Sequence, residues 1–187
     1  MKPPSSSPVR SMVYASMFGA LTAIGALIVI PMQPVPFTLQ TFFTGLSGAL
    51  LGGYAGALSQ IVYVILGCIG LPVFAGGKAG LGVLFGPTGG YLIGFIAGAY
   101  IIGKIVEARP QAGVLWSAMA ILVGDLVIYG LGTLQLAMVA HLSPGKAILV
   151  GIVPFLIPEL IKLIAAAILS SRLRKRLPIM EKANDHN

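Results

Sequence analysis

The chain has 187 residues, of which 57% are hydrophobic and 9% are charged, and it carries a formal net charge of +7. A soluble domain carries about 25% charged residues, so this chain lacks the polar side chains to cover a water-soluble globule. Its basic residues lie at the ends of apolar segments and are not interleaved with aromatic side chains, which argues against nucleic-acid binding. The composition predicts a membrane protein that has the lipid bilayer as its solvent.

A first membrane span is expected over residues 12–30, after a polar tail at residues 1–11. Its length of about 28 Å crosses a bilayer, and we interpret it as a retained span rather than a signal peptide. Ala15, Gly19 and Ala23 recur at four-residue spacing on one helix face, where another backbone can approach closely. Two interpretations of that face stay open: packing within the same bundle, or docking of a separate membrane protein.

A proline-rich connection follows the first span. Pro31, Pro34 and Pro36 cannot continue a helix and predict an extended, low-entropy segment. Thr38 and Gln40 then bring a hydroxyl and an amide to the start of the second span, where Thr38 could serve simply as a helix cap. Amides near an apolar phase need partners, so Gln33 and Gln40 are candidate polar contacts.

Short second and third spans are expected at about residues 39–51 and 55–69, joined by a glycine turn. The next segment, residues 70–86, is apolar yet rich in glycine, with Lys78 near its middle. Irregular backbone at membrane depth must be buried or line a cavity, so this segment is predicted to fold over the protein as a lid. The alternative is a connector that lies on the lipid headgroups.

Three further spans are expected, at about residues 87–106, 114–134 and 148–170. Glycines at residues 86, 90, 94 and 98 form a second small-residue ridge on the fourth span. The fifth span carries Asp125 and Tyr129 one turn apart. The sixth holds Pro154 and Pro158, which predict a kink, and it also holds Glu159 and Lys162.

The fold class predicted is an all-α polytopic membrane protein with six transmembrane helices spanning residues 12–171 and a basic tail at residues 172–187. Six spans place both termini on one side of the membrane. Nine basic residues then lie on the terminal side and two on the other, which makes the N- and C-termini cytoplasmic. The nine are Lys2, Arg10, Lys104, Arg109, Arg172, Arg174, Lys175, Arg176 and Lys182, and the two are Lys78 and Lys146.

Glu159 and Lys162 are ionisable groups within an apolar span, and such groups are costly and commonly functional. Three residues apart, they share a helix face and can pair with each other as a structural ion pair. Alternatively, they offer an acceptor and a donor to a polar ligand in a mostly apolar pocket. Asp125 and Tyr129 could add a carboxylate and a phenol there, or Asp125 could bond to another helix.

The sequence argues against an enzyme. No histidine cluster suits a metal, and no Ser/His or Cys/His pair can be argued into proximity. The single cysteine, Cys68, provides neither a disulfide framework nor a thiol metal site. The Gly-Lys pairs lack the other residues of a phosphate-binding loop, so if ATP drives this protein, a partner hydrolyses it.

Four motifs occur in order: QPVPFTLQ at residues 33–40, GLPVF at 70–74, GPTGGYL at 86–92 and PELIK at 158–162. Together they resemble the BioY family, the substrate-capture (S) subunits of energy-coupling-factor (ECF) biotin transporters, over about residues 12–171. The resemblance implies a multi-pass protein of a prokaryotic cytoplasmic membrane that binds biotin from outside and has no cofactor. Its implied partners are a membrane coupling subunit, docked through Ala15, Gly19 and Ala23, and two cytoplasmic ATPases.

The resemblance also suggests a pose. Glu159 accepts from a ureido N–H of biotin and Lys162 donates to the ureido oxygen, while the Lys78 region meets the carboxylate. The reverse pose places the carboxylate on Lys162. The family usually has Asp where Glu159 stands, which makes Lys162 the stronger candidate for direct contact. The predicted binding residues are Gln33, Phe37, Thr38, Phe74, Lys78, Tyr91, Asp125, Tyr129, Glu159 and Lys162.

Two other function classes compete with this one. An ion-coupled secondary transporter would use Asp125 and Glu159 to carry protons, although no internal repeat typical of such transporters is visible. A structural assembly subunit would use Glu159 and Lys162 for stability alone.

Overall fold

The structure is a computed structural model that describes residues 8–109, 111 and 113–174. Most of the predicted N-terminal tail and most of the basic C-terminal tail lie outside these residues. The elements are α1 (Pro8–Leu27), β1 (Val29–Ile30), β2 (Phe37–Thr38), α2 (Gln40–Leu51), α3 (Gly53–Cys68), α4 (Leu81–Leu84), α5 (Gly89–Glu107), α6 (Val114–Val139), α7 (Pro144–Gly151), the 3-10 helix η1 (Val153–Phe155) and α8 (Leu156–Arg174).

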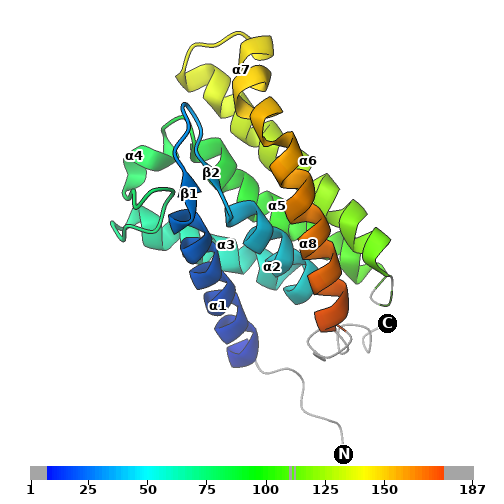
Figure 1. The fold of residues 1–187 in the computed structure, drawn as a ribbon. Helices are drawn as coiled ribbons and strands as arrows, with labels where there is room; N and C mark the ends of the chain where they lie inside the picture. Colours follow the sequence, from blue (N-terminus) through cyan, green and yellow to red (C-terminus); the bar gives the residue numbers. More distant parts are fainter. Residues whose placement is uncertain (1–7, 110, 112, 175–187) are drawn as a thin grey trace, which may run out of the picture.

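Long apolar helices dominate the described chain, which confirms the all-α class (Figure 1). Among the described residues, four helical segments are long and apolar enough to cross a membrane: Val9–Leu27, Gly89–Glu107, Val114–Val139 and Pro144–Arg174. The helices α2 and α3, with 12 and 16 residues, are shorter than the roughly 20 residues of a full span. The apolar runs of the sequence therefore predict where helices form, but they do not by themselves settle how many of these helices cross the bilayer.

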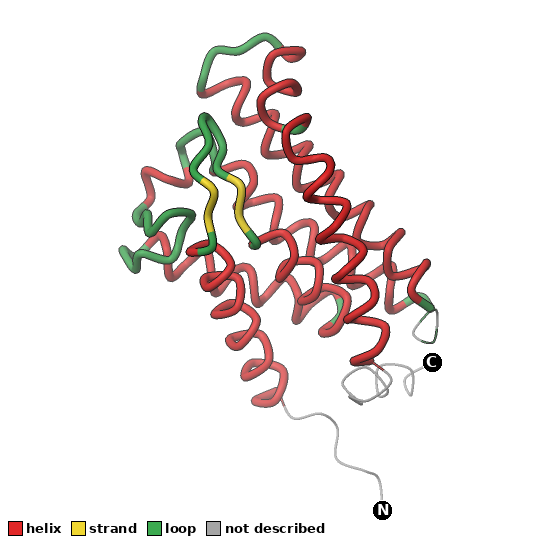
Figure 2. The backbone as a smooth tube through the Cα atoms, viewed as in Figure 1, coloured by secondary structure: helices red, strands yellow, loops and turns green. Residues whose placement is uncertain are grey.

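The two ends of the bundle differ in character. In Figure 2 the hairpin and most of the loop segments lie toward one end, and the turn between α6 and α7 lies at that end too. The start of α1, the end of α8 and the connection from α5 to α6 lie at the opposite end (Figure 1). The hairpin and most of the loops thus lie at one end of the helical bundle.

The proline-rich connection is extended only at its flanks, which pair with each other, and it bends at residues 33–35. Val29 lies opposite Thr38 and Ile30 opposite Phe37 in an antiparallel ribbon. The N-cap of α2 is Leu39 rather than Thr38, and the Leu39 N–H donates to the Gly25 carbonyl at 3.0 Å. This ribbon brings the side chains of Phe37 and Thr38 to the top of α2.

The small-residue face of α1 packs inside this chain. Ala15 is 1% exposed, and a Cβ added to Gly19 would lie 2.9 Å from the Ser59 carbonyl oxygen of α3. Ala23 packs against the buried cluster around Tyr63. The prediction that Ala15, Gly19 and Ala23 form an outward docking face is therefore corrected: α3 covers that face, which is the other of the two interpretations.

The glycine ridge of α5 meets α6 in the same way. A Cβ on Gly94 would lie 2.8 Å from the Ile128 Cα, and one on Gly98 would lie 3.1 Å from the Gly124 carbonyl oxygen. Side chains at these positions would force the two helices apart. Close contact between α5 and α6 fixes the wall that carries Tyr91 and Tyr129.

The last predicted span is interrupted once. The helix α7 begins at Pro144 with Ser143 as its N-cap, as the Ser-Pro signal predicts, and ends at Gly151. Pro154 lies in η1, between α7 and α8. Pro158 falls in the first turn of α8, where its missing N–H costs no helical hydrogen bond. Because the helix is interrupted at Pro154, α8 begins at Leu156 and Glu159 lies in its first turn.

A buried polar cluster joins α1, α2 and α3. The Gln60 amide nitrogen lies 3.2 Å from Thr22 Oγ1, 3.2 Å from Ser47 Oγ and 3.0 Å from Ser59 Oγ. Its amide oxygen accepts from Thr44 Oγ1 at 3.2 Å, and all five side chains are fully buried. Because each buried polar group has a partner, the cluster stabilises one arrangement of the three helices.

Candidate functional site

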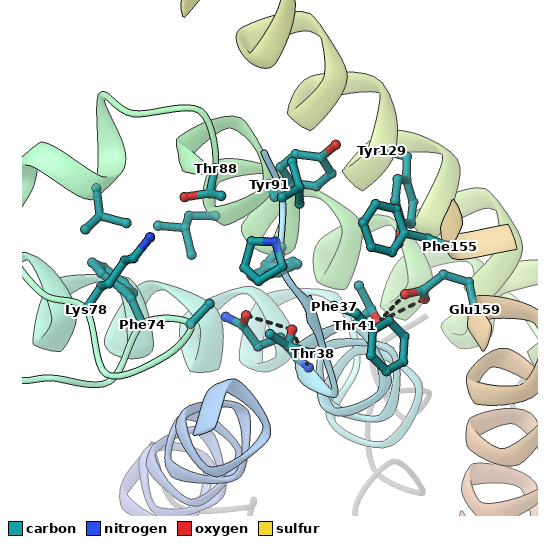
Figure 3. Close-up of a pocket in the computed structure, with 17 residues that line it drawn as sticks. Phe37, Thr38, Thr41, Phe74, Lys78, Thr88, Tyr91, Tyr129, Phe155 and Glu159 are labelled. Atoms are coloured by element: carbon teal, nitrogen blue, oxygen red, sulfur yellow. Dashed lines mark hydrogen bonds between the residues drawn. The ribbon is translucent and has the colours of Figure 1, made fainter. Parts of the chain in front are cut away.

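A cavity of about 630 Å³, measured with its open mouth, lies between the hairpin, the lid segment and the helices α2, α5, α6 and α8 (Figure 3). Its walls are mostly apolar and aromatic, with a few polar groups at either end, as in small-molecule sites generally. The lining residues are Val35, Pro36, Phe37, Thr38, Gln40, Thr41, Phe74, Ala75, Lys78, Val83, Thr88, Tyr91, Leu92, Phe95, Tyr129, Phe155 and Glu159.

Glu159 provides the acidic group of this cavity and is partly buried. Its side chain is 12% exposed, and its carboxylate accepts from Thr41 Oγ1 at 2.9 and 3.2 Å. Lys162, on the next turn of α8, donates to the same carboxylate. A carboxylate has about four lone-pair positions, so Glu159 retains acceptor capacity on the cavity side.

Lys162 stands behind Glu159 rather than in the cavity wall. Its ammonium donates to the Thr38 carbonyl at 2.9 Å, to Thr41 Oγ1 at 2.6 Å and to Glu159, which uses all three N–H groups. It also lies 4.4 Å from the ring centroid of Phe37. The structure therefore reverses the expected ranking: Glu159 faces the cavity, and Lys162 holds Glu159, Thr41 and the hairpin in place.

Asp125 lies outside the main cavity as well. It is 8% exposed and lines a second, small cavity beside Glu159 and Lys162. Its Oδ1 has no hydrogen-bond partner among the described residues. The prediction that Asp125 contacts the ligand is corrected to a position behind the charged pair.

The lid segment, residues 70–86, is anchored to the bundle by Phe74. The Phe74 ring is 1% exposed, fills the space beside Gly67 and packs edge-on against Tyr63 with centroids 5.7 Å apart. The Gly80 N–H donates to the Gly67 carbonyl at 2.7 Å. This buried anchor agrees with a lid that folds over protein rather than onto headgroups.

A second set of bonds holds the lid at its other end. The Gln135 amide of α6 donates to the Leu84 carbonyl at 2.8 Å and to the Gly86 carbonyl at 2.9 Å. Between its two anchors the lid presents Lys78, which is exposed and lines the cavity. Figure 3 shows Lys78 at one end of the cavity and Glu159 at the other.

Aromatic side chains from three elements form the long wall. The rings of Tyr91 and Tyr129 meet edge-on at 5.7 Å, and Tyr129 lies 6.2 Å from Phe155 of η1. The Tyr91 hydroxyl donates to the Gly151 carbonyl at 3.0 Å, which ties α5 to the end of α7. The break in the last span therefore contributes to the site, because it places Phe155 against this wall.

Gln40, rather than Gln33, is the amide of the site. The Gln40 amide nitrogen donates to the Tyr63 hydroxyl at 2.6 Å, and its oxygen accepts from Thr38 Oγ1 at 2.9 Å. Gln33 is exposed in the connection and does not line the cavity, so its prediction as a binding residue is corrected. An amide on the first turn of a helix faces inward here, whereas one in the hairpin loop faces out.

Several lining residues were not predicted. Thr41 bridges Glu159 and Lys162, and the QPVPFTLQ motif ended one residue before it. Thr88 lies inside the GPTGGYL motif, where the hydroxyl was the available signal. Phe95 and Phe155 look like ordinary apolar span residues in the sequence, and nothing there marks them as cavity residues.

The polar groups and the apolar walls of the cavity suit the binding of a small ligand. In the described part of the chain, no group of three His, Cys, Asp or Glu side chains is placed to hold a metal ion. The groups present are one acceptor-rich carboxylate, several hydroxyls, an amide and a peripheral ammonium around an apolar centre. Such an arrangement fits a small ligand with a polar head, an apolar body and an anionic tail.

Comparisons with known proteins agree on one family. A family model described as "BioY family" matches residues 1–179. The biotin transporter BioY of Thermotoga maritima is 47% identical, covering 89% of this chain and 97% of that protein. The probable biotin transporter BioY of Pyrococcus horikoshii is 42% identical, covering 85% and 93%. A crystal structure of the S-component for biotin from an ECF-type ABC transporter has a TM-score of 0.85 and 26% identity, covering 92% and 95%.

Proposed function

This chain belongs to the BioY family, and we propose that it is the biotin-binding S subunit of an ECF-type transporter. The relatives are named as biotin transporters, and the similar solved chain is an S-component for biotin. The observation that carries the proposal is the order of groups along the cavity: a partly buried carboxylate at one end, aromatic walls between, and a lysine at the mouth. Transport, rather than catalysis, is the role that these groups support.

The chemical groups of biotin follow the same order as the groups that line the cavity. Its ureido ring offers two N–H donors and one acceptor, its thiophane ring and valeryl chain are apolar, and its carboxylate is anionic. In the pose we propose, Glu159 accepts from one ureido N–H of biotin. Tyr129 and the second N–H of Gln40 offer donors toward the ureido oxygen, a role that the sequence had given to Lys162.

The apolar body of biotin then lies against Phe37, Phe74, Tyr91 and Phe155, all of which line the cavity. Aromatic rings supply large rigid contact surfaces for such a body. The carboxylate lies toward Lys78, where an ammonium is the complementary group.

We further propose six membrane crossings with both termini in the cytoplasm. The helices α2 and α3 are short, so these two crossings require tilt, local thinning or cover by their neighbours. In this topology the hairpin, the lid and the α6–α7 turn face outward, where external biotin arrives. The membrane is then the cytoplasmic membrane of a prokaryotic cell.

The proposed partners are a membrane coupling subunit and two cytoplasmic ATPases, which release the ligand inward. With Ala15 and Gly19 covered by α3, a coupling subunit would meet the outer side of α1, which exposes Met17 and Ile24. Exposed apolar side chains on a membrane helix also face lipid, so a partner there replaces lipid contacts.

Titration of the purified full-length chain with biotin tests the proposal. We expect saturable binding at one site, with heat measured by calorimetry, and loss of most of the affinity in Glu159→Gln. Absence of binding even at millimolar biotin would overturn the substrate assignment. Tight binding that Glu159→Gln leaves unchanged would overturn the proposed pose.

A further inference from the structure

The cavity has one deep end and one open end. At the deep end, Glu159 is 12% exposed by side chain, Lys162 is 7% exposed and Thr41 is 9% exposed. Among the described residues that line the cavity, Lys78 alone is exposed. Its position at the far end from Glu159 places the mouth at the lid (Figure 3).

The backbone around Lys78 leaves open space. A Cβ added to Gly76, Gly77 or Gly80 would meet nothing within 4 Å, whereas one added to Gly67 or Gly132 would run into an aromatic ring. Gly67 lies on α3 and Gly132 on α6, so these helices are closely packed beside the ligand body, whereas the lid backbone around Lys78 is unobstructed. A ligand group that emerges beside Lys78 enters solvent rather than protein.

The charges at the deep end orient the ligand. A carboxylate placed beside Glu159 would bring two anions together in a buried site, which is strongly unfavourable. The ammonium of Lys162 offers no free donor to such a carboxylate, because its N–H groups already bond to Thr38, Thr41 and Glu159. The carboxyl end of the ligand therefore points toward Lys78 and the mouth.

From these observations, and resting on the proposed biotin function, we infer that the site also takes biotin amides, in which the carboxyl group is joined to an amine. Proteolysis of proteins that carry biotin on a lysine side chain releases biotinyl-lysine, the simplest member of this class. Its ring and valeryl chain occupy the cavity as in biotin, and its amino-acid part extends past Lys78 into solvent.

The effect of amide formation is small in this geometry. It removes the negative charge that Lys78 attracts, and an exposed ion pair contributes up to about fivefold in affinity. The contacts at Glu159 and along the aromatic walls are retained. Amides should therefore bind within about tenfold of biotin, and Lys78 should account for most of the difference.

Equilibrium binding of three ligands to the purified full-length chain tests this inference. The ligands are biotin, biotinyl-lysine and diaminobiotin, which lacks the ureido carbonyl, and the variants are wild type and Lys78→Ala. We expect the amide within about tenfold of biotin, and at least hundredfold weaker binding of diaminobiotin. Lys78→Ala should weaken biotin binding up to about fivefold and leave amide binding unchanged.

The outcomes separate the inference from the function on which it rests. If biotin binds and biotinyl-lysine binds more than hundredfold more weakly, the lid closes on the carboxyl group and the inference is wrong. If Lys78→Ala weakened the binding of biotin and of biotinyl-lysine equally, the inference would also be contradicted, because Lys78 would then not interact specifically with the free carboxylate. If biotin itself does not bind, the proposed function is wrong, and the inference about biotin amides falls with it.

Discussion

The deep end and the mouth of the cavity are built from different kinds of structure. Glu159, Lys162 and Thr41 lie on the helices α2 and α8 and bond to one another; Lys162 and Thr41 are buried and Glu159 is partly buried. Lys78 lies on a glycine-rich loop, is exposed, and stands where added atoms meet open space. Recognition that needs fixed geometry is thus placed on helices, and the mouth of the cavity is formed by a loop. Changes at the deep end should have larger effects than changes at the mouth.

The largest effect is expected from removing Lys162. In Lys162→Met the buried Glu159 carboxylate loses its cation, and breaking one partner of a buried ion pair costs about 3–5 kcal/mol. Thermal unfolding of the detergent-purified protein should show a clear drop in midpoint temperature. The double variant Glu159→Gln/Lys162→Met should recover much of that stability, since it leaves no buried charge in the pair. A single variant as stable as wild type would show that the pair is not buried as described.

A smaller effect is expected on ligand affinity at Glu159, in a variant that also loses stability because it leaves the buried Lys162 ammonium without its carboxylate. Glu159→Gln keeps the shape but replaces a charged acceptor that contributes about 1.5–3 kcal/mol to a hydrogen bond. Biotin affinity should fall about tenfold to a hundredfold in calorimetry. Glu159→Asp is the matched control, because it keeps the charge and should retain more affinity than the glutamine variant. The reverse order would argue that side-chain length, not charge, matters here.

The lid anchor should have a kinetic effect. In Gly67→Ala the new methyl group would overlap the Phe74 ring, and overpacking of this kind costs about 1–3 kcal/mol. We expect faster dissociation of biotin, about fivefold or more, in a chase with unlabelled ligand. Gly130→Ala is the control, because its methyl group would meet nothing within 4 Å. Equal dissociation rates in the two variants would contradict the anchoring role of Phe74.

The smallest effect is expected at the mouth. Lys78→Gln should weaken biotin binding by less than about 1 kcal/mol, because an exposed ion pair is screened by water and salt. The difference between variant and wild type should shrink further as salt is raised. A salt-independent loss of more than tenfold would place Lys78 in a buried contact with the ligand, and the comparison between the two ends would fail.

Much of the scaffold could be predicted from the order of apolar runs and helix breakers. Ser143 and Pro144 mark the start of α7, and Pro154 marks the break before α8, because each acts through local backbone chemistry. The helix α6 runs to Val139, beyond the expected end at residue 134. Gln135 looks like an interruption in the sequence, but its amide bonds to lid carbonyls and the helix continues.

The site could be predicted in part. The spacing of Glu159 and Lys162 predicts that they share a face, yet residues three apart differ by about 60° around the helix. Which of them reaches the cavity depends on how α8 is rotated against α2, and that is set by tertiary packing. The pairing of Phe74 with Gly67 likewise depends on contacts between segments that local patterns do not specify.

The buried cluster around Gln60 has a mechanical consequence. It ties α1, α2 and α3 through side chains with no exposed surface, and separating any two of these helices would strand polar atoms in an apolar interior. These three helices should therefore move as one rigid body. Opening of the site is then confined to the seams around that body, namely the hairpin, the lid and the contact between α2 and α8. A displacement of α1 would therefore also displace α2, and with it Thr41 in the site.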